Sequence, residues 1–363
     1  MTRSVVKQSA AKQSVAKQKV AARSVAAREL SSRYDVVVVG GGAAGLSGAL
    51  MLARSRRSVL VVDSGAPRNA PAEGVHGLLG HDGVKPADLV ERGRAEVRRY
   101  GGQVVHGEVA GVVRADAGFT VSLADGRSVH ARRLLVASGL VDELPPVDGL
   151  RERWGHDVVH CPYCHGWEVR DRAIGVLASG PMSVHQALLF RQLSDDVTYF
   201  ANNRPLSDED AEKLAALGVP VVAGEVKAVE VADDRVAGVR LSDGTVVARE
   251  VVAVATRMVA RADFLAGLGL HAVEHPSGAG VHVPADAAGR TEVPGVWVAG
   301  NVTEPSAQVG ASSAAGAAAG AQINADLVAE SARWAVDTHR SPFAHASEAH
   351  NADRVAGTRR HGL

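Results

Sequence analysis

Two cysteines and a histidine lie together in the stretch CPYCHGWE, residues 161–168, and they are the side chains of this sequence best suited to redox chemistry. Two residues separate Cys161 from Cys164, the spacing of a redox-active dithiol, and His165 follows directly. The same letters satisfy C-x-x-C-H, the pattern to which a c-type haem is attached covalently. A Cys2His zinc site and a purely structural pair of thiols are further interpretations of the stretch.

The remaining composition narrows these four interpretations. The 363 residues contain no other cysteine, which excludes a long-range disulfide framework and a four-cysteine zinc site. The first residues lack the apolar core of a secretory signal, and no apolar run is long enough to span a bilayer, so we expect a cytoplasmic protein without a membrane partner. Because haem attachment belongs to exported proteins, the redox dithiol is favoured.

The charge of the chain gives no indication of a large anionic partner. The 40 Lys and Arg residues balance 40 Asp and Glu residues, which is neither the basic footprint of a nucleic-acid-binding protein nor a surface suited to anionic lipid. With 46% hydrophobic residues, the chain can form two domains that each bury a core. We therefore expect a globular protein that binds a small molecule and no nucleic acid.

Both ends of the chain differ from its centre in composition. Residues 1–33 are rich in Lys, Arg, Ser and Ala, with Glu29 as their only acid, and we expect a flexible N-terminal extension there. The same composition also resembles an organelle transit peptide. Residues 332–363 are expected to form a disordered C-terminal tail, whose histidines follow no helical ligand spacing.

Residues 34–63, YDVVVVGGGAAGLSGALMLARSRRSVLVVD, have the pattern of a strand–helix–strand unit. The turn before the helix has Gly40, Gly42 and Gly45 at the spacing G-x-G-x-x-G, and Asp63 ends the second strand. The glycines permit a tight turn, approach of the backbone to a pyrophosphate and close helix packing, while a terminal acid can bind a ribose hydroxyl. Because these features are in register, this unit is predicted to bind a dinucleotide.

A second strand–helix–strand unit is expected over residues 173–203, but its turn lacks the nucleotide fingerprint. Residues 178–183 read ASGPMS, so one glycine of the fingerprint remains, and Pro181 has no N–H to offer a phosphate. The following strand ends in YFANN, residues 199–203, and is followed only by Arg204, which offers little for the 2′-phosphate of NADP. The sequence therefore predicts a dinucleotide-binding domain without its dinucleotide.

Two later stretches complete a resemblance to a known family. ASG, residues 137–139, ends an apolar strand, and GVWVAGN, residues 295–301, precedes an Ala- and Gly-rich segment. Together with the glycine turn and the C-x-x-C pair, they resemble the thioredoxin reductase-like flavoproteins from about residue 34 to residue 331. The resemblance implies an α/β fold with two Rossmann-like dinucleotide-binding domains, the second inserted in the first. The FAD domain would comprise residues 34–152 and 255–331, and the inserted C-x-x-C domain residues 153–254.

Within this family the sequence resembles one branch in particular. His165 stands where an acid usually follows the second cysteine, and the NADPH fingerprint is missing. Both departures resemble the FAD-dependent dithiol oxidases that close intramolecular disulfides in natural products such as gliotoxin, holomycin and romidepsin. CPYCHGWE and AGNVTEPSAQV, residues 299–309, are most similar to the bacterial, holomycin-type members. Asn301 replaces the aspartate common in thioredoxin reductases, which predicts an altered contact with the ribityl chain of the flavin.

The resemblance also implies a set of site residues. Cys161 would face the substrate, Cys164 would face the flavin, and His165 would exchange protons with both thiols. No metal is expected. The FAD would bind to the residues that match the family's motifs in the first domain: Gly40, Gly42, Ala43, Ala44, Gly45, Asp63, Ser64, Ala137, Ser138, Gly139, Gly300, Asn301, Gln308 and Val309.

The activity that the resemblance implies is oxidation of a small-molecule dithiol to an intramolecular disulfide, with O2 as acceptor and hydrogen peroxide as product. The reduced form of a dithiolopyrrolone such as holomycin is the expected substrate, and a homodimer is the expected assembly. Two alternatives stay open at this stage. One is an NADPH-dependent disulfide reductase of the thioredoxin reductase type, and the other is a reductase that receives electrons from another protein.

Overall fold

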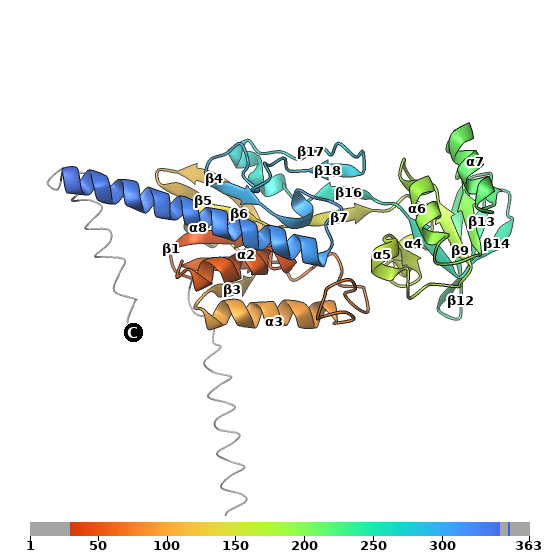
Figure 1. The fold of residues 1–363 in the computed structure, drawn as a ribbon, viewed down its shortest axis with the longest axis horizontal. Coiled ribbons are helices and arrows are strands. Elements are labelled where there is room, and N and C mark those ends of the chain that lie inside the picture. Colours follow the sequence, from red (N-terminus) through yellow and green to blue (C-terminus); the bar gives the residue numbers. More distant parts are fainter. Residues whose placement is uncertain (1–29, 342–347, 349–363) are drawn as a thin grey trace, which may run out of the picture. The chain divides into compact units, whose positions relative to one another are not determined.

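The computed structural model describes residues 30–341 and Glu348, and its largest sheet contains both strands of the glycine-turn unit (Figure 1). The two sides of this sheet differ in strand direction. On one side the strands run parallel to each other, and on the other side they form an antiparallel meander. The strand order is β3 (Gln103–His106), β2 (Val59–Asp63), β1 (Arg33–Val39), β6 (Ser128–Val136), β5 (Gly118–Leu123) and β4 (Val109–Ala115), and β19 (Val296–Val298) also pairs with β6.

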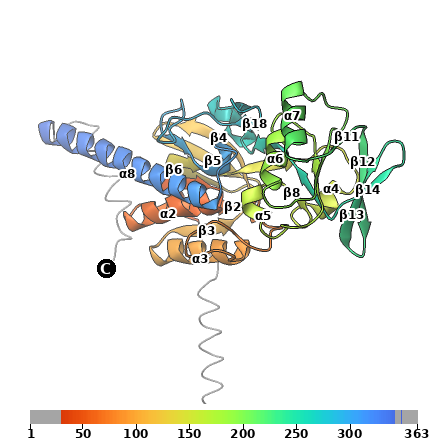
Figure 2. The same ribbon diagram turned by 45° about the vertical axis from the view of Figure 1, so that its right-hand side comes forward.

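Three helices accompany this sheet, namely α2 (Ala43–Arg54), α3 (Pro86–Arg99) and α8 (Val309–Arg340). α2 and α8 lie side by side in Figures 1 and 2, and small residues allow this contact. A Cβ placed on Gly316 of α8 would lie 1.9 Å from the carbonyl oxygen of Ala44 in α2, so only glycine fits there. The core beneath the helices contains buried strand residues such as Val36, Val61 and Trp297.

A second sheet carries the other strand–helix–strand unit, and all of its strands are parallel. Its strands are fully buried apart from the edges, as the continuous apolar runs in the sequence indicate. The order is β11 (Val221–Val222), β10 (Val197–Phe200), β9 (Ile174–Leu177), β15 (Val251–Val254) and β8 (Val158–Val159). Beside it are α4 (Leu150–Arg153), α5 (Pro162–His165), α6 (Ser183–Phe190), α7 (Asp208–Ala216) and the strands β12 (Val226–Ala232), β13 (Arg235–Leu241) and β14 (Val246–Ala248).

The chain passes between the two sheets through a pair of antiparallel strands, β7 (Leu140–Glu143) and β16 (Arg257–Ala260). Met258 pairs with Asp142 in this ladder. β17 (Val273–Glu274) and β18 (Gly280–His282) complete the small sheet, and the 3-10 helices η1 (Asp263–Leu268) and η2 (Gly300–Val302) follow β16 and β19. The predicted α/β architecture, with one dinucleotide-type unit inserted in the other, is confirmed.

The structure tests the sequence prediction for part of the C-terminal end of the chain and not for residues 1–29. α8 continues to Arg340, so the expectation of a disordered tail from residue 332 is wrong for residues 332–340. The helix extends because residues 332–340 contain no Gly or Pro that would end it. The proposed extension over residues 1–29, and the tail beyond 341 apart from Glu348, lie outside the described residues.

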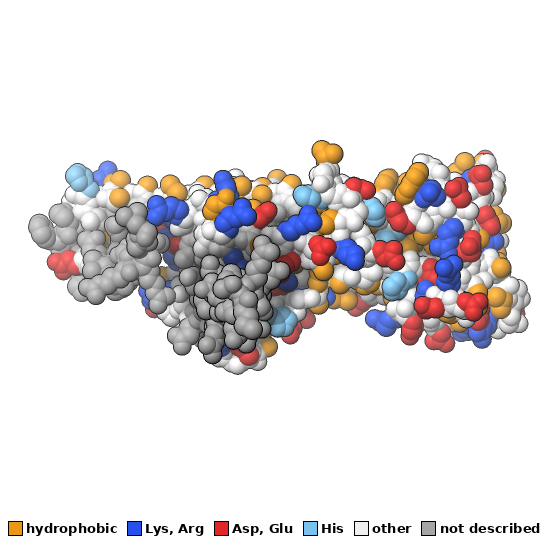
Figure 3. All heavy atoms as spheres, turned by 90° about the horizontal axis from the view of Figure 1, so that it is seen from below, with side chains coloured by type: hydrophobic (Ala, Val, Ile, Leu, Met, Phe, Trp, Pro, Cys, Tyr) orange, Lys and Arg blue, Asp and Glu red, His pale blue; other side chains and the backbone are white. Residues whose placement is uncertain are grey.

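The surface of the described part is mixed in charge. On the face shown in Figure 3, basic and acidic side chains are interspersed, in agreement with the balanced composition. Within residues 30–341, no helix combines the length and the apolar character that crossing a bilayer requires.

Candidate functional site

The first glycine turn forms a cradle between β1 and α2. Gly40 has φ +102°, and a Cβ there would lie 2.2 Å from the carbonyl oxygen of Ala137. A Cβ on Gly45 would lie 1.9 Å from the carbonyl oxygen of Gly40, whereas Gly42 faces open space. Gly42 is the N-cap of α2, and no side chain caps this terminus among the described residues. The backbone N–H groups of the turn are therefore directed at an anion-sized space.

Asp63 ends β2 beside this turn, as predicted, and its carboxylate already has two protein donors. Arg94 on α3 donates from Nη2 to Asp63 Oδ2 at 2.6 Å, and the backbone N–H of Gly65 donates to Oδ1 at 3.2 Å. The Arg94 side chain fixes the carboxylate and leaves lone pairs for a ribose hydroxyl. Sequence reasoning missed Arg94, because nothing in the motif indicates a partner on a helix 31 residues later.

The opposite wall of the cradle consists of the 137–139 turn and the segment that leads into α8. Ser138 Oγ donates to the carbonyl oxygen of Arg261 at 2.6 Å. Asn301 Nδ2 donates to the carbonyl oxygens of Glu304, Pro305 and Ala307 at 3.1, 3.0 and 2.9 Å. A carboxylate could not donate to any of these carbonyls, so Asn301 has a structural reason to differ from aspartate.

The helix α8 begins at Val309, with Gln308 as its N-cap, and no side chain caps it among the described residues. Two uncapped helix N-termini, those of α2 and α8, therefore border the same space. A dinucleotide cofactor with a pyrophosphate and a polarisable ring fits this donor set, because helix N-termini favour negative charge.

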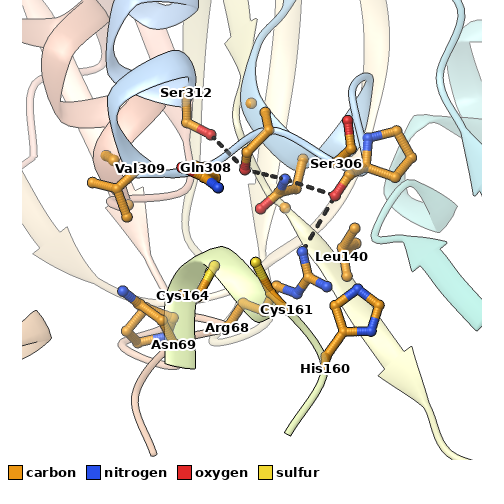
Figure 4. A pocket seen from close by; sticks show the side chains of 18 of the residues that line it. Arg68, Asn69, Leu140, His160, Cys161, Cys164, Ser306, Gln308, Val309 and Ser312 are labelled. Atoms are coloured by element: carbon orange, nitrogen blue, oxygen red, sulfur yellow. Dashed lines mark hydrogen bonds between the residues drawn. The ribbon is translucent and has the colours of Figure 1, made fainter. Parts of the chain in front are cut away.

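The dithiol faces this space from α5. Cys161 is the N-cap of α5 and Cys164 lies one turn later, and both thiols are free. Figure 4 shows the two sulfur atoms directed toward the segment with Ser306, Gln308 and Val309. This places the predicted redox pair opposite the start of α8.

The two thiols differ in acidity. A hydrogen bond from Cys164, and then backbone N–H groups of Tyr163 and Cys164, lower the pKa of Cys161 to about 7 against the opposing effect of burial. The hydrogen bond to the Cys161 sulfur and burial raise the pKa of Cys164 above its ordinary value. As the N-cap of α5, Cys161 is thus the more acidic of the two thiols.

His165 lies beside the dithiol but bonds to neither thiol. Both of its ring nitrogens are buried and have no hydrogen-bond partner among the described residues. Burial lowers the pKa of His165, and the nearby Glu168 carboxylate opposes this effect. The imidazole is therefore neutral near pH 7 and able to accept a proton from a group that is bound beside it. His160 differs from His165 because one of its ring nitrogens has a protein partner. His160 comes just after the end of β8, and its Nδ1 lies 3.2 Å from the carbonyl oxygen of Val254.

One cavity of about 1320 Å³ connects the cradle, the dithiol and the second nucleotide turn. This volume exceeds the several hundred to about 1,000 Å³ of a typical ligand pocket, and so it has room for a dinucleotide and a second molecule. Gly45 does not line the cavity but packs against Gly40. The predicted residues that do line it are Gly40, Gly42, Ala43, Ala44, Asp63, Ser64, Ala137, Ser138, Gly139, Cys161, Cys164, His165, Gly300, Asn301, Gln308 and Val309.

The second nucleotide turn, between β9 and α6, is occupied by the side chain of Ser183. The backbone N–H groups of Ser179 and Gly180 both donate to the hydroxyl oxygen of Ser183, at 3.0 and 3.1 Å. Ser183 is fully buried, and Pro181 contributes no N–H. The donors that would hold a pyrophosphate in such a turn are therefore already bonded.

The end of the following strand is closed in the same way. Asn202, just after β10, donates from Nδ2 to the carbonyl oxygen of Ala178 at 3.4 Å and accepts from the N–H of Val226 at 2.9 Å. The turn between β17 and β18 also approaches, since a Cβ on Gly278 would lie 4.0 Å from Pro181 Cγ. The position that would read a ribose or a 2′-phosphate is thus occupied by internal contacts.

The fold and site define a class of protein. Residues 34–321 match the family described as pyridine nucleotide-disulphide oxidoreductase, and the chain belongs to this family. Among solved structures, it is similar to the crystal structure of HlmI, with 47% sequence identity and a TM-score of 0.81 over 85% of this chain and 97% of that chain. The predicted membership of the thioredoxin reductase-like proteins is confirmed.

Two fungal proteins are similar to it in sequence. Thioredoxin reductase tcpT of Claviceps purpurea is 34% identical over 252 residues, which are 66% of this chain and 78% of that protein. Thioredoxin reductase sirT of Leptosphaeria maculans is 30% identical over 324 residues, 83% of this chain and 98% of that protein. An oxidoreductase activity follows from this membership.

Proposed function

We propose that this protein is an FAD-dependent dithiol oxidase, which converts a small-molecule dithiol into an intramolecular disulfide and uses O2 as the final acceptor. The second nucleotide turn is the observation that carries the proposal. Its N–H groups are bonded to the Ser183 hydroxyl, so the pyrophosphate of a nicotinamide nucleotide lacks its donors there. Electrons must then enter from the thiol side of the molecule.

FAD fits the first cradle, where no side chain takes up the N–H groups of the turn as Ser183 does in the second. Gly42 leaves open space at an uncapped helix N-terminus, and Asp63 is held in place by Arg94 for a ribose. When bound, FAD supplies a two-electron acceptor that returns the reduced cysteine pair to its disulfide and that dioxygen can reoxidise.

The cysteine pair performs the exchange with the substrate. In the disulfide form, a substrate thiolate attacks Cys161 and Cys164 departs as a thiolate. The second substrate thiolate then attacks the substrate's own sulfur in the mixed disulfide. Cys161 departs as a thiolate, and the cyclic disulfide product is released. The substrate loses two electrons and two protons, and dioxygen gains both to form hydrogen peroxide, so the overall reaction is balanced.

The substrate is proposed to be compact. The cavity of about 1320 Å³ has room beside a dinucleotide for a small molecule, and Cys161 lines that cavity. The reduced form of a dithiolopyrrolone is the first candidate, with diketopiperazine dithiols next. A preference for reduced thioredoxin over these small dithiols would contradict this substrate class.

The direct test is to offer the enzyme electrons from both sides. Under anaerobic conditions, NADPH or NADH should leave the visible absorbance of the flavin unchanged, because neither nucleotide finds its phosphate donors. A substrate dithiol should bleach the same band, and admitted air should restore it with one hydrogen peroxide formed per disulfide. Absorbance spectra and a peroxide assay provide both measurements.

Two results would lead elsewhere. Rapid bleaching by NADPH at low concentration would identify a nicotinamide-dependent reductase and contradict the oxidase. Slow reoxidation in air, with fast reoxidation by an added protein, would retain the dithiol chemistry and replace dioxygen as the acceptor.

A pH profile tests His165 as the proton acceptor. Replacing His165 by Asn should slow turnover most near neutral pH, where the neutral imidazole is needed to ionise the substrate thiol, and least at alkaline pH, where thiols with an ordinary pKa of about 8.5 ionise unaided. His156→Asn, the same change at an exposed histidine, is the control. A loss of rate that is equal at every pH would assign His165 a packing role.

A further inference from the structure

An arginine that no motif predicted lies next to the dithiol. Arg68, in the loop after β2, donates from Nε and Nη2 to the two carboxylate oxygens of Asp142 on β7, at 2.6 and 2.7 Å. Thr256 Oγ1 donates to the same carboxylate at 2.6 Å. The Asp142 side chain is only 6% exposed. The pair is therefore a bidentate, largely buried ion pair at the point where the chain passes between its two sheets.

The Arg68 side chain also lines the dithiol cavity. Arg68 Nη1 donates to the carbonyl oxygen of Pro305 at 3.3 Å, and Figure 4 shows the guanidinium beside the Cys161 side chain. Asp142 binds the guanidinium from β7, and its carboxylate also accepts from Thr256. The charge of Arg68, and not that of Asp142, acts on both thiols.

The electrostatic environment of the thiols agrees with this geometry. The Arg68 charge lowers the pKa of Cys164 against the stronger effects that raise it, and it is the smallest of the effects that lower the pKa of Cys161. The other titratable or charged side chains near the dithiol are His160, His165, Glu168 and His76.

We propose that Arg68 is a positioning residue, which Asp142 and Thr256 hold so that a fixed positive charge favours the departure of Cys161 and Cys164 as thiolates. Both cysteines leave as thiolates during the exchange, and a more acidic leaving thiol departs faster. The charge does not need to reorganise during the reaction, because three protein contacts fix the guanidinium beforehand. This inference rests on the proposed dithiol chemistry but concerns the thiols themselves.

The test measures thiol ionisation without substrate, oxygen or any added nicotinamide nucleotide. Reduced holoenzyme is alkylated with iodoacetamide under anaerobic conditions over a range of pH, and peptide mass spectrometry identifies the modified cysteine. The wild-type midpoint for Cys161 is expected near pH 7. Arg68→Gln should raise this midpoint by a fraction of a unit, because Arg68 is the smallest of the effects that lower this pKa. The reaction would then be roughly twofold slower at pH values below both midpoints.

Further variants separate the charge of Arg68 from the structural pair. Arg68→Gln leaves the Asp142 carboxylate without its partner, so the double variant Arg68→Gln/Asp142→Asn replaces both charges and removes that effect. Its midpoint should remain raised, because the charge of Arg68 acts on both thiols and that of Asp142 does not. The Cys161 midpoint of Arg68→Lys should lie between those of the wild type and Arg68→Gln, since lysine keeps the charge without the bidentate fork. Arg170→Gln is the matched control, because Arg170 stacks on the exposed Trp167 with its guanidinium carbon 4.1 Å from the ring centroid.

A folded double variant with the wild-type midpoint would overturn the proposal and leave the pair a purely structural role. If Arg68→Gln fails to fold, the double variant and Arg68→Lys decide the question in the same assay. The outcome is independent of the nucleotide experiment, since an NADPH-driven reductase could show the raised midpoint and an oxidase could lack it.

Discussion

Replacing Cys161 by serine is expected to abolish turnover, by a factor on the order of a thousand or more, while the flavin stays bound. The reason is that Cys161 is the sulfur that the substrate attacks, whereas the flavin cradle is built from residues of the first domain and the start of α8. The same outcome is expected for Cys164→Ser, because no disulfide can form without the second sulfur. Oxygen consumption with a substrate dithiol measures the loss, and the visible spectrum shows whether flavin remains.

The two serine variants should differ from each other in their reaction with the chromogenic disulfide dithionitrobenzoate. In Cys164→Ser the new hydroxyl can replace the hydrogen bond that the lost thiol donated, and the backbone N–H donors to Cys161 remain. Cys161 should therefore still react quickly and retain one stable mixed disulfide, because no second thiol can displace it. In Cys161→Ser the remaining Cys164 loses the hydrogen bond that raises its pKa but stays buried, and it should react more slowly. Wild-type turnover in either serine variant would contradict the dithiol mechanism, and faster reaction of Cys164 would reverse the two roles.

The second large effect is expected at Gly45. An alanine there would place its Cβ 1.9 Å from the carbonyl oxygen of Gly40 and 3.3 Å from Val38 Cγ1, so α2 must move away from the sheet. We expect Gly45→Ala to lower the free energy of unfolding by at least about 2 kcal/mol and to release the flavin, because overpacking at backbone contact cannot be relieved by a side-chain rotation. Thermal unfolding and the ratio of visible to ultraviolet absorbance measure these two losses.

Two other glycines provide matched controls for this substitution. Gly180, in the corresponding turn of the second domain, has nothing within 4 Å of an added Cβ, so Gly180→Ala should leave stability and flavin content unchanged. Gly42 also faces open space, but it lies where the cofactor would approach. Gly42→Ala should therefore fold normally and lose flavin. A stable, flavin-replete Gly45→Ala protein would refute the packing argument.

The parts of the site that the sequence predicted are those encoded within one short stretch. The glycine turn, Asp63 and the cysteine pair each depend on spacing along a strand–turn–helix segment, and the structure places them as expected. The loss of two of the three fingerprint glycines in the second turn was also visible in the sequence. The sequence alone does not show that the Ser183 hydroxyl accepts the two turn N–H groups in the place of a phosphate oxygen. That contact depends on the three-dimensional path of the turn.

The unpredicted parts are contacts between distant residues. Arg68 and Asp142 are 74 residues apart, and Arg133 on β6 binds Asp326 on α8, 193 residues away. Arginines are abundant in this sequence, so composition gives no reason to select one of them. The backbone contacts of Asn301 were unpredicted for a related reason, since its hydrogen bonds go to residues 304–307 and cannot be inferred from a substitution alone, while its expected contact with the ribityl chain stays a prediction.

The occupied second turn also constrains how this protein could change over evolutionary time. Ser183→Ala alone would remove two hydrogen bonds, at a cost of about 1 kcal/mol each, and would gain no ligand while Pro181 still lacks an N–H. Pro181→Gly alone would add one donor to a turn whose other two donors remain bonded to Ser183. Neither single step brings a benefit on which selection could act, and Asn202 would have to be released as well. Restoring the phosphate donors of this turn therefore requires coordinated changes at Ser183, Pro181 and Asn202 rather than one substitution.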